Sequence, residues 1–234
     1  MTTMPGDPWS DGPAVVSFGF KLKKLIAFDI DQGMLTFTAW VRLRWLDDRL
    51  YFNGSAVFGP LWNSTVDSIA IPNGAIWKPD VYQSNEAMAT HEHRDTDVYL
   101  WDRAGGQERG GNLYWVYPVT FVVKCTHDLT NFPFDVQHCK LVFESWMYNS
   151  RMLQFLPNMV DVLEPNDIHS EIQSYRIKPY GALTGDGKVS TYALTGRTYS
   201  TVWVEWQLER YYHYYVSNAI LPMMIMEVMC VFTV

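Results

Sequence analysis

The side chains with the clearest chemistry in this sequence are aromatic rings at positions that a protein core does not require. Trp40 lies on the polar side of an alternating stretch, and Trp146 and Tyr148 share one face of the predicted strand after Cys139. Tyr192 and Tyr199 flank a glycine-containing turn that can fold over a site. Converging ring faces attract an ammonium group, by about 2 kcal/mol or more per desolvated contact. A single ring is more often a packing residue, but the set predicts a box for a cationic small molecule.

Motifs for catalysis or metal binding do not accompany these rings. His91-Glu92-His93 lacks the second histidine at helical spacing that a zinc protease needs, so solvated loop histidines are the simpler interpretation. Nothing predicts a cleft around the carboxylates Asp47-Asp48, and the sequence has no phosphate loop or nucleophile elbow. A net charge of −7 without a basic stripe argues against nucleic acid as a partner. We predict a protein that is not an enzyme and that has no cofactor or metal site.

Two cysteines, Cys125 and Cys139, enclose thirteen residues with Phe132-Pro133-Phe134-Asp135 near the middle. The third, Cys230, lies far away in an apolar run, so pairing the first two is the natural arithmetic. A disulfide there would stabilise the fold by about 3 kcal/mol on the chain-entropy estimate and keep an aromatic-proline-aromatic wedge in shape. The alternative is a pair of buried thiols in a reducing cell, which the flanking sequence disfavours.

The elements that must position these residues are short strands. Hydrophobic residues alternate over 35–43, 113–124 and 201–208, a further strand is predicted over 140–147, and turn residues separate such segments. The predicted fold class is all-β, an Ig-like Greek-key β-sandwich of about ten strands spanning 13–210. Residues 1–12 are polar, with no apolar stretch of signal-peptide type, and are predicted to be a disordered or artificial amino terminus.

The carboxy-terminal segment, 211–234, has a different character. It begins with the aromatic cluster Tyr211-Tyr212-His213-Tyr214-Tyr215, typical of a membrane interface, and continues almost wholly apolar. Pro222 is tolerated in a membrane helix, whereas Glu227 needs a partner or a wet cavity there. We predict a junction and a truncated first transmembrane helix. The alternative is the buried terminal helix of a soluble protein. Sequons at Asn53 and Asn63 predict glycosylation on an extracellular surface.

Four motifs along the chain resemble those of the Cys-loop receptors, the pentameric ligand-gated ion channels. They are Trp45-x-Asp47-x-Arg49-Leu50, Trp77-Lys-Pro-Asp80, Phe132-Pro-Phe-Asp135 with Cys139, and Ser145-Trp146-x-Tyr148. Arg210, with Pro222 twelve residues on, resembles the family's junction into its first membrane helix. The resemblance covers nearly the whole chain and implies the extracellular ligand-binding domain of a plasma-membrane channel. The runner-up is a soluble ligand-binding relative of the acetylcholine-binding protein type, and an adhesion-type sandwich is a more distant third.

The resemblance also implies which residues form the site between neighbouring subunits. The expected principal face comprises Trp146, Tyr148, Tyr192, Tyr199, Ser84 and Tyr82. The expected complementary face comprises Trp40, Arg42, Tyr114 and Val116. Because one chain carries both faces, the implied assembly is a homopentamer in a lipid bilayer, this chain with four identical partners.

Two departures from the family pattern bear on the ligand. Ser84 stands where the family has a principal-face tyrosine, so the expected box lacks one wall unless Tyr82 reaches in, and Leu194-Thr195 replaces the vicinal cysteines of nicotinic α subunits. Arg42 shares the Trp40 face and resembles the arginine that pairs with the agonist carboxylate in amino-acid-gated members. The expected ligand is therefore an ammonium-bearing, possibly zwitterionic small molecule.

The parts implied in gating lie at the opposite end of the predicted domain. The turn containing Asp29 and Asp31 and the wedge Phe132–Asp135 (Phe132, Pro133, Phe134, Asp135) resemble the family's membrane-facing loops. Arg210 resembles the junction arginine that pairs with acids of those loops, and Asp135 and Asp31 are its candidate partners.

Overall fold

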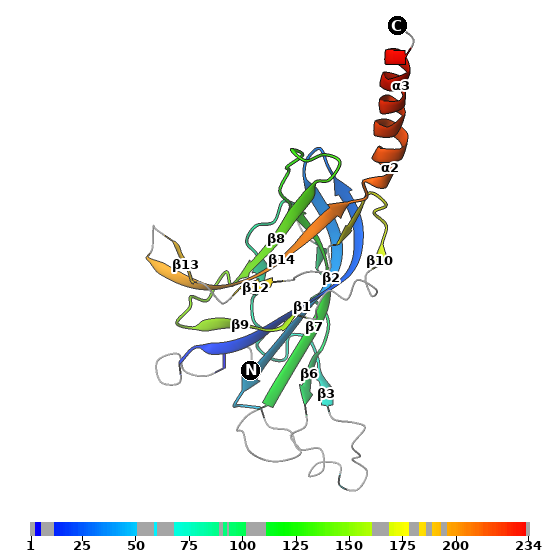
Figure 1. Cartoon of the computed structure of the whole chain (residues 1–234). Helices are drawn as coiled ribbons and strands as arrows, with labels where there is room; N and C mark the ends of the chain where they lie inside the picture. The colour runs from blue at the N-terminus through cyan, green and yellow to red at the C-terminus, as the bar shows by residue number, and fades with distance from the viewer. Residues whose placement is uncertain are drawn as a thin grey trace.

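A computed structural model of the chain shows two β-sheets packed face to face, with a helix projecting from one end (Figure 1). The structure describes residues 3–5, 12–50, 59, 68–88, 91–92, 94–101, 111–160, 169–177, 183–185, 189–192 and 196–232. Within these ranges it contains fourteen strands. The predicted β-sandwich is confirmed. The structure has more strands than the roughly ten that were predicted, because several of its strands are pieces of only two to four residues.

The larger sheet has eight strands in the described part of the chain and carries the longest ladder. Its strands are β1 (Ala14–Asp29), β2 (Met34–Asp47), β3 (Ser68–Ile71), β5 (His91–Glu92), β6 (Val98–Trp101), β7 (Gly111–Lys124), β9 (Leu153–Val160) and β10 (His169–Ser170). The order is β10-β1-β2-β7-β6-β3, with β5 beside β7 and β9 running parallel to β1. The β2–β7 ladder is unbroken along both strands, so it fixes which residues share a face.

The second sheet has six strands among the described residues and is built around β8 and β14. Its strands are β4 (Tyr82–Gln83), β8 (Val136–Glu144), β11 (Tyr175–Ile177), β12 (Leu183–Gly185), β13 (Val189–Tyr192) and β14 (Arg197–Arg210). The order is β11-β14-β8-β4, and β12 and β13 both pair with β14. The strand that carries Cys139, β8, therefore lies beside β14, the strand that leads into the helix.

The inward faces of both sheets form one aromatic core. On β2 the alternation is regular: Leu35, Phe37, Ala39, Val41 and Leu43 are all buried, as the sequence pattern predicts. Phe37 and Trp206 meet edge to face with centroids 5.0 Å apart, and such pairs are worth about 1 kcal/mol beyond their buried area. This core fixes the register of the outward-facing residues, because a slip by one residue would expose the whole apolar set.

The predicted strand over 140–147 is displaced in the structure. The strand begins at Val136, inside the cysteine ring, and ends at Glu144. It ends there because the Asp80 carboxylate accepts hydrogen bonds from Ser145 Oγ (2.6 Å) and from the backbone N–H of Met147 (2.7 Å). The strand β9 was also not predicted from the sequence.

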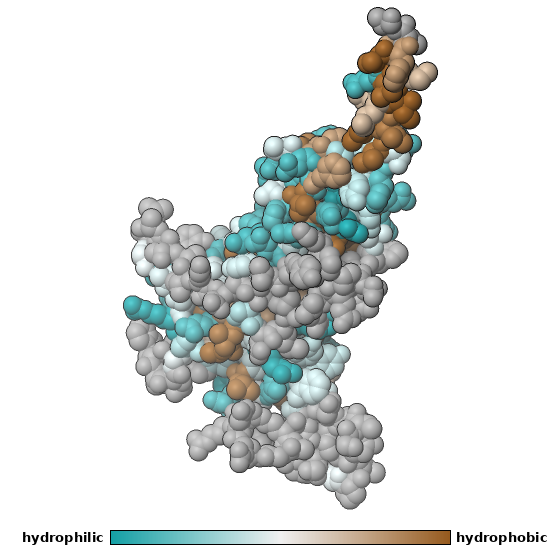
Figure 2. All heavy atoms as spheres, in the orientation of Figure 1, coloured by the Kyte–Doolittle hydropathy of each residue, from teal (hydrophilic) through white to brown (hydrophobic). Residues whose placement is uncertain are grey.

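The carboxy-terminal helix projects from the sandwich as α2 (His213–Tyr215), η3 (Val216–Ile220) and α3 (Leu221–Phe232). Its side chains are apolar and exposed over most of its length, as the brown column in Figure 2 shows against the polar surface of the sandwich. His213–Phe232 is long and apolar enough to cross a membrane by length and composition.

Part of the amino terminus differs from the predicted disorder. Thr3 accepts hydrogen bonds from both terminal nitrogens of Arg49, at 2.9 and 2.8 Å, and Pro5 is buried. Arg49 itself binds both carboxylate oxygens of Asp47, whose side chain is fully buried. The short segment Thr3–Pro5 is thereby attached to the end of β2.

Candidate functional site

The first group of candidate site residues gathers where the start of β4 lies beside the end of β8. Tyr82 lies opposite Glu144 in the ladder, and its ring meets Trp146 edge to face with centroids 5.4 Å apart. Trp146 is 75% exposed, which is unusual for a tryptophan. Ser84, one step beyond β4, is also exposed and donates its backbone N–H to Val142 O. Tyr82, Ser84 and Trp146 therefore lie at one edge of the six-stranded sheet.

Tyr148 takes a different direction from Trp146. Its hydroxyl accepts a hydrogen bond from Trp77 Nε1 at 3.2 Å, and the two rings lie 6.0 Å apart. The predicted shared strand face does not exist, because β8 ends at Glu144 and the following residues turn around Asp80. Tyr148 packs against the core and supports the turn that presents Trp146.

Glu144 is a further candidate site residue, which the sequence patterns did not predict. It is 3% exposed, and its carboxylate accepts a hydrogen bond from the Tyr82 hydroxyl. A buried carboxylate beside two exposed or half-exposed rings provides negative charge where a cation can also contact ring faces. The available signal was its place directly before Ser145-Trp146, on the strand face opposite the inward-facing Phe143.

The β13–β14 hairpin approaches the same region. Ser150 donates its backbone N–H to Thr198 O at 2.7 Å, and the two hydroxyls lie 2.6 Å apart. These contacts attach the segment that carries Trp146 to β14 near the turn of the hairpin. Tyr199, half-buried, pairs with Ser190 across the hairpin, and Tyr192 pairs with Arg197. The side chain of Tyr192 lies outside the described residues, as do both sequon asparagines, Asn53 and Asn63.

The second group of candidate residues lies on the outer face of the eight-stranded sheet. Arg42 is opposite Val116, and Arg44 is opposite Tyr114, so all four share the face of Trp40. Trp40 is 38% exposed, and the Arg42 guanidinium carbon lies 5.8 Å from its ring centroid. The Trp40 group and the Trp146 group thus occupy different sheets of one chain.

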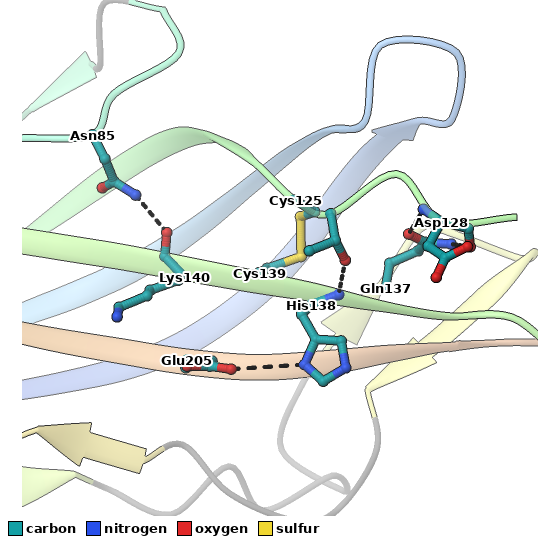
Figure 3. Close-up of a disulfide and its surroundings, with 9 residues drawn as sticks. Asn85, Cys125, Asp128, Gln137, His138, Cys139, Lys140 and Glu205 are labelled. Carbon is teal, nitrogen blue, oxygen red and sulfur yellow. Dashed lines mark hydrogen bonds and ion pairs between the residues drawn. A yellow bond between two sulfur atoms is a disulfide. The ribbon is translucent and has the colours of Figure 1, made fainter.

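The predicted disulfide is present between Cys125 and Cys139, as Figure 3 shows. Within the ring, Gln137 Nε2 donates to Asp128 O at 2.8 Å and to Asp135 Oδ2 at 2.9 Å. The Asn85 amide donates to Lys140 O at 2.7 Å (Figure 3). Its oxygen also accepts from Val142 N–H, and the two bonds hold the strand that leaves the ring. The ring is therefore held by side-chain hydrogen bonds as well as by its covalent link.

A buried ion pair joins the ring to the end of β14. Arg210 donates from Nε to Asp135 Oδ1 at 2.5 Å and from a terminal nitrogen to Oδ2 at 3.0 Å, and the side chains are 2% and 1% exposed. The Tyr175 hydroxyl donates to Asp135 Oδ2 at 3.2 Å. Burial by itself raises the pKa of Asp135, but hydrogen bonds from Arg210 and Gln137 outweigh it and hold the pKa below its usual value. Burial, with Asp135 beside it, raises the pKa of Tyr175, so the hydroxyl remains a donor.

Aromatic rings surround the same arginine and connect it to the helix. Its guanidinium carbon lies 4.6 Å from the Tyr175 ring, 5.0 Å from Phe132 and 5.4 Å from Tyr215. Phe132 also meets Tyr215 edge to face at 4.9 Å, and Phe134 meets Tyr212 at 5.0 Å. The cis-proline wedge at Phe132-Pro133 thus rests on the first residues of the apolar helix.

The Asp29–Gly33 turn attaches to the ring through the backbone. Asp29 Oδ1 accepts from the N–H groups of Asp31 and Gln32, which closes the turn on itself. Gly33, at φ +66°, accepts the N–H of Cys125 at 2.7 Å, and a Cβ there would lie 3.3 Å from Cys125 O. Of the two acids expected near Arg210, the structure brings Asp135 into contact, while Asp31 is exposed and lines an open groove with Glu86 and Lys124.

Comparison with known proteins gives a consistent result. Residues 3–212 match the family described as neurotransmitter-gated ion-channel ligand binding domain. The chain is 27% identical over 221 residues to Ligand-gated ion channel 4 of Caenorhabditis briggsae, covering 94% of this chain and 32% of that protein. It is 26% identical over 228 residues to neuronal acetylcholine receptor subunit alpha-2 of Homo sapiens, covering 96% and 39%. It is 32% identical over 142 residues to acetylcholine receptor subunit beta-type acr-2 of Caenorhabditis elegans, covering 60% and 22%.

These relatives are longer proteins, of which the matched region is 22% to 39%. The family match extends from the segment bound to Arg49 to the first residues after Arg210, and so includes both sheets, the disulfide ring and both groups of exposed aromatic residues. The chain belongs to the neurotransmitter-gated ion-channel ligand binding domain family, a class of channel receptors and not of enzymes.

Proposed function

We propose that this chain is the extracellular ligand-binding part of a plasma-membrane channel that assembles as a homopentamer. In this proposal the Trp146 group of one subunit and the Trp40 group of its neighbour enclose an ammonium-bearing small molecule. The observation that carries the proposal is the 75% exposure of Trp146 beside Tyr82 and the buried Glu144. Exposed apolar surface that adjoins polar groups marks a candidate contact surface for a ligand or a partner.

The charges of the two groups support a ligand with two ionic ends. Glu144 and the rings of Tyr82 and Trp146 favour an ammonium group. Arg42, on the other group, offers a guanidinium that suits a carboxylate. A zwitterion of the amino-acid type matches both. Leu194-Thr195 stand where nicotinic α subunits have their vicinal cysteines, so acetylcholine itself is not implied.

The proposed route from site to membrane uses the same β-strands. Ligand contacts with Trp146 and Tyr199 would favour one position of the β13–β14 hairpin, and β14 ends at Arg210, which is bound to the ring. A ligand shifts a conformational equilibrium only by its differential affinity for the two states. The wedge Phe132–Asp135 against Tyr212 and Tyr215 would pass that difference to the helix.

The experiment that tests the proposal is electrophysiology of the full-length protein against a panel of amines and amino acids. Evoked currents support a channel. Ligand binding by a protein that forms no channel would favour the runner-up, a soluble relative with the same sandwich, although the exposed apolar helix His213–Phe232 argues against that alternative. A full-length protein that is monomeric would contradict the proposal.

Trp146→Ala is expected to raise the half-maximal concentration of the most effective amine in that panel by about 30-fold. The reason is the loss of a cation–π contact worth about 2 kcal/mol when desolvated. Trp146→Phe keeps an aromatic ring, so it is expected to raise the half-maximal concentration clearly less than Trp146→Ala does. Trp203→Ala, which removes an outer-face tryptophan stacked on Lys140, serves as the matched control and is expected to leave the dose–response curve unchanged. Equal effects of the two alanine variants would contradict the assignment of Trp146.

Arg42→Ala is expected to weaken binding of γ-aminobutyrate by at least about tenfold while leaving that of tetramethylammonium, which has no acidic group, nearly unchanged. A hydrogen bond to a charged group contributes about 1.5–3 kcal/mol, and only the first compound presents a carboxylate. Arg44→Ala removes the same charge from the same face, but from the Tyr114 ring and not the Trp40 ring, and is expected to weaken γ-aminobutyrate binding clearly less than Arg42→Ala does. Unchanged affinity of Arg42→Ala for γ-aminobutyrate would contradict the proposal that the ligand is a zwitterion.

A further inference from the structure

The ring of Trp40 already has a cation of its own chain on it. Lys23 Nζ lies 4.7 Å from the ring centroid, closer than the Arg42 guanidinium carbon at 5.8 Å. Both distances are within the roughly 6 Å over which a ring attracts a cation. We infer that Lys23 is a specificity-determining residue. Its ammonium group occupies the face of the Trp40 ring, so this side of the site favours the acidic group of a ligand over its ammonium group. The inference rests on the proposed function and refines it.

The position of Lys23 depends on an irregularity in β1. The ladder with β2 pairs Leu22 with Ala39 and then Lys24 with Thr38, so Lys23 is the extra residue of a β-bulge. Bulges re-aim side chains and occur next to binding sites more often than elsewhere. In a regular ladder, Lys23 would be only a diagonal neighbour of Trp40, which pairs directly with Lys21. In the bulged strand the ammonium group of Lys23 lies over the ring.

The bulge has a second effect on charge. Lys24 is also turned outward and pairs with Glu171 at 2.6 Å, so its charge is neutralised locally. Lys23, by contrast, contributes its charge to the Trp40 face, where Arg42 and Arg44 also lie. This face therefore gathers positive charge, whereas the Trp146 group contains the carboxylate of Glu144. The two groups have opposite charge.

The consequence for a ligand follows from Coulomb's law and ring occupancy. An ammonium group approaching Trp40 must displace Lys23 and meet like charges, which disfavours it. Next to Trp146, Tyr82 and Glu144 it meets ring faces and a carboxylate. The ligand is thus oriented with its ammonium toward the subunit that supplies Trp146 and its acidic group toward Lys23 and Arg42. A simple quaternary ammonium compound gains only the first set of contacts.

The test compares two probes on the purified full-length receptor by calorimetric titration: tetramethylammonium, which is only a cation, and γ-aminobutyrate, which has both charges. Lys23→Met keeps the aliphatic stem and removes the charge. The measured quantity is the ratio of the γ-aminobutyrate dissociation constant to that of tetramethylammonium. The ratio is expected to rise about fivefold in Lys23→Met, because a cation–π contact at an exposed site is worth up to about 1 kcal/mol. An unchanged ratio overturns the inference, and so does a failure of Lys23→Met to bind tetramethylammonium.

The controls separate this inference from the proposed function. Lys140→Met removes a matched contact, with Lys140 Nζ 4.6 Å from the Trp203 centroid on the other sheet, and is expected to leave the ratio unchanged. Lys23→Gln, a second charge-removing variant, must reproduce the shift seen in Lys23→Met. If Trp146→Ala weakens binding while the ratio is the same in Lys23→Met and wild type, only the role of Lys23 fails. If Trp146→Ala leaves both dissociation constants unchanged, the proposed site itself is wrong.

Discussion

Arg210→Gln is expected to lower the free energy of unfolding by about 3–5 kcal/mol, because it leaves Asp135 buried without its cation. The carboxylate would retain hydrogen bonds from Gln137 and Tyr175, which do not neutralise its charge. Guanidinium denaturation of wild type and variant, followed by tryptophan fluorescence, measures the difference. Asp135→Asn is expected to lower the free energy of unfolding by a similar amount, because it leaves the Arg210 guanidinium buried without its anion.

An exposed ion pair elsewhere on the same sheet provides the control. Arg176 and Glu209 contact at 3.0 Å with side chains 53% and 29% exposed, and such surface pairs contribute about 0–1 kcal/mol. Arg176→Gln is therefore expected to change stability little. The double variant Arg210→Met, Asp135→Leu is expected to be more stable than either single variant, because no unpaired charge remains. Losses as small as that of Arg176→Gln would show that solvent reaches the Asp135 pair.

The pH dependence of stability follows from the same pair. The folded-state pKa of Asp135 lies below its unfolded value, so ionised Asp135 stabilises the fold at pH values above the unfolded pKa, about 3.9. This contribution is lost as the pH falls through the folded-state pKa. Asp135→Asn should therefore flatten the acid limb of a plot of stability against pH.

The same pair also bears on the proposed coupling. In the full-length protein, Arg210→Gln should retain ligand binding and lose the evoked current, and a normal current would contradict the proposed coupling.

Much of the fold was predictable because it follows from local patterns. The alternation on β2 and β7 has period two and places an unbroken apolar set on one side of each strand, so neither the strand nor its buried face was ambiguous. The disulfide followed from cysteine arithmetic. The end of β8 was not predictable, because a contact with Asp80, more than sixty positions away, terminates the strand. Long-range contacts of this kind override local propensity.

The candidate site was predictable to a smaller extent for the same reason. Trp40 was identifiable as an outward ring from its strand alone, and the structure leaves it partly exposed. Tyr148 was grouped with Trp146 by an alternation that the turn around Asp80 breaks, and it contacts Trp77. The proposed roles of Glu144 and Lys23 were not predictable, because Glu144 is identified by its hydrogen bond with the Tyr82 hydroxyl and Lys23 lies in a bulge. Neither a cross-strand hydrogen bond nor a bulge leaves a periodic signal in sequence.

The disulfide is the next largest determinant of stability that the chain offers for test. Cys125 and Cys139 are fourteen positions apart, and closing a loop of that length in the unfolded chain stabilises the fold by about 3 kcal/mol. Replacing both cysteines with serine is expected to remove that amount, measured by the same denaturation experiment. The comparison is made in a Cys230→Ser background, so that no remaining thiol can form a different disulfide.

The size of the loss also tests how the ring is held. Hydrogen bonds from Gln137 to Asp128 O and Asp135 Oδ2 and the bond from Cys125 N–H to Gly33 O remain possible without the covalent link. If these contacts suffice, the serine variant is less stable but retains the Asp135–Arg210 pair, and Arg210→Gln still costs its full 3–5 kcal/mol in that background. If the ring opens, the two losses are no longer additive, because the wedge has already left Arg210. Strict additivity would show that the disulfide acts on the unfolded chain, whereas strong coupling would make it a direct support of the junction with the helix.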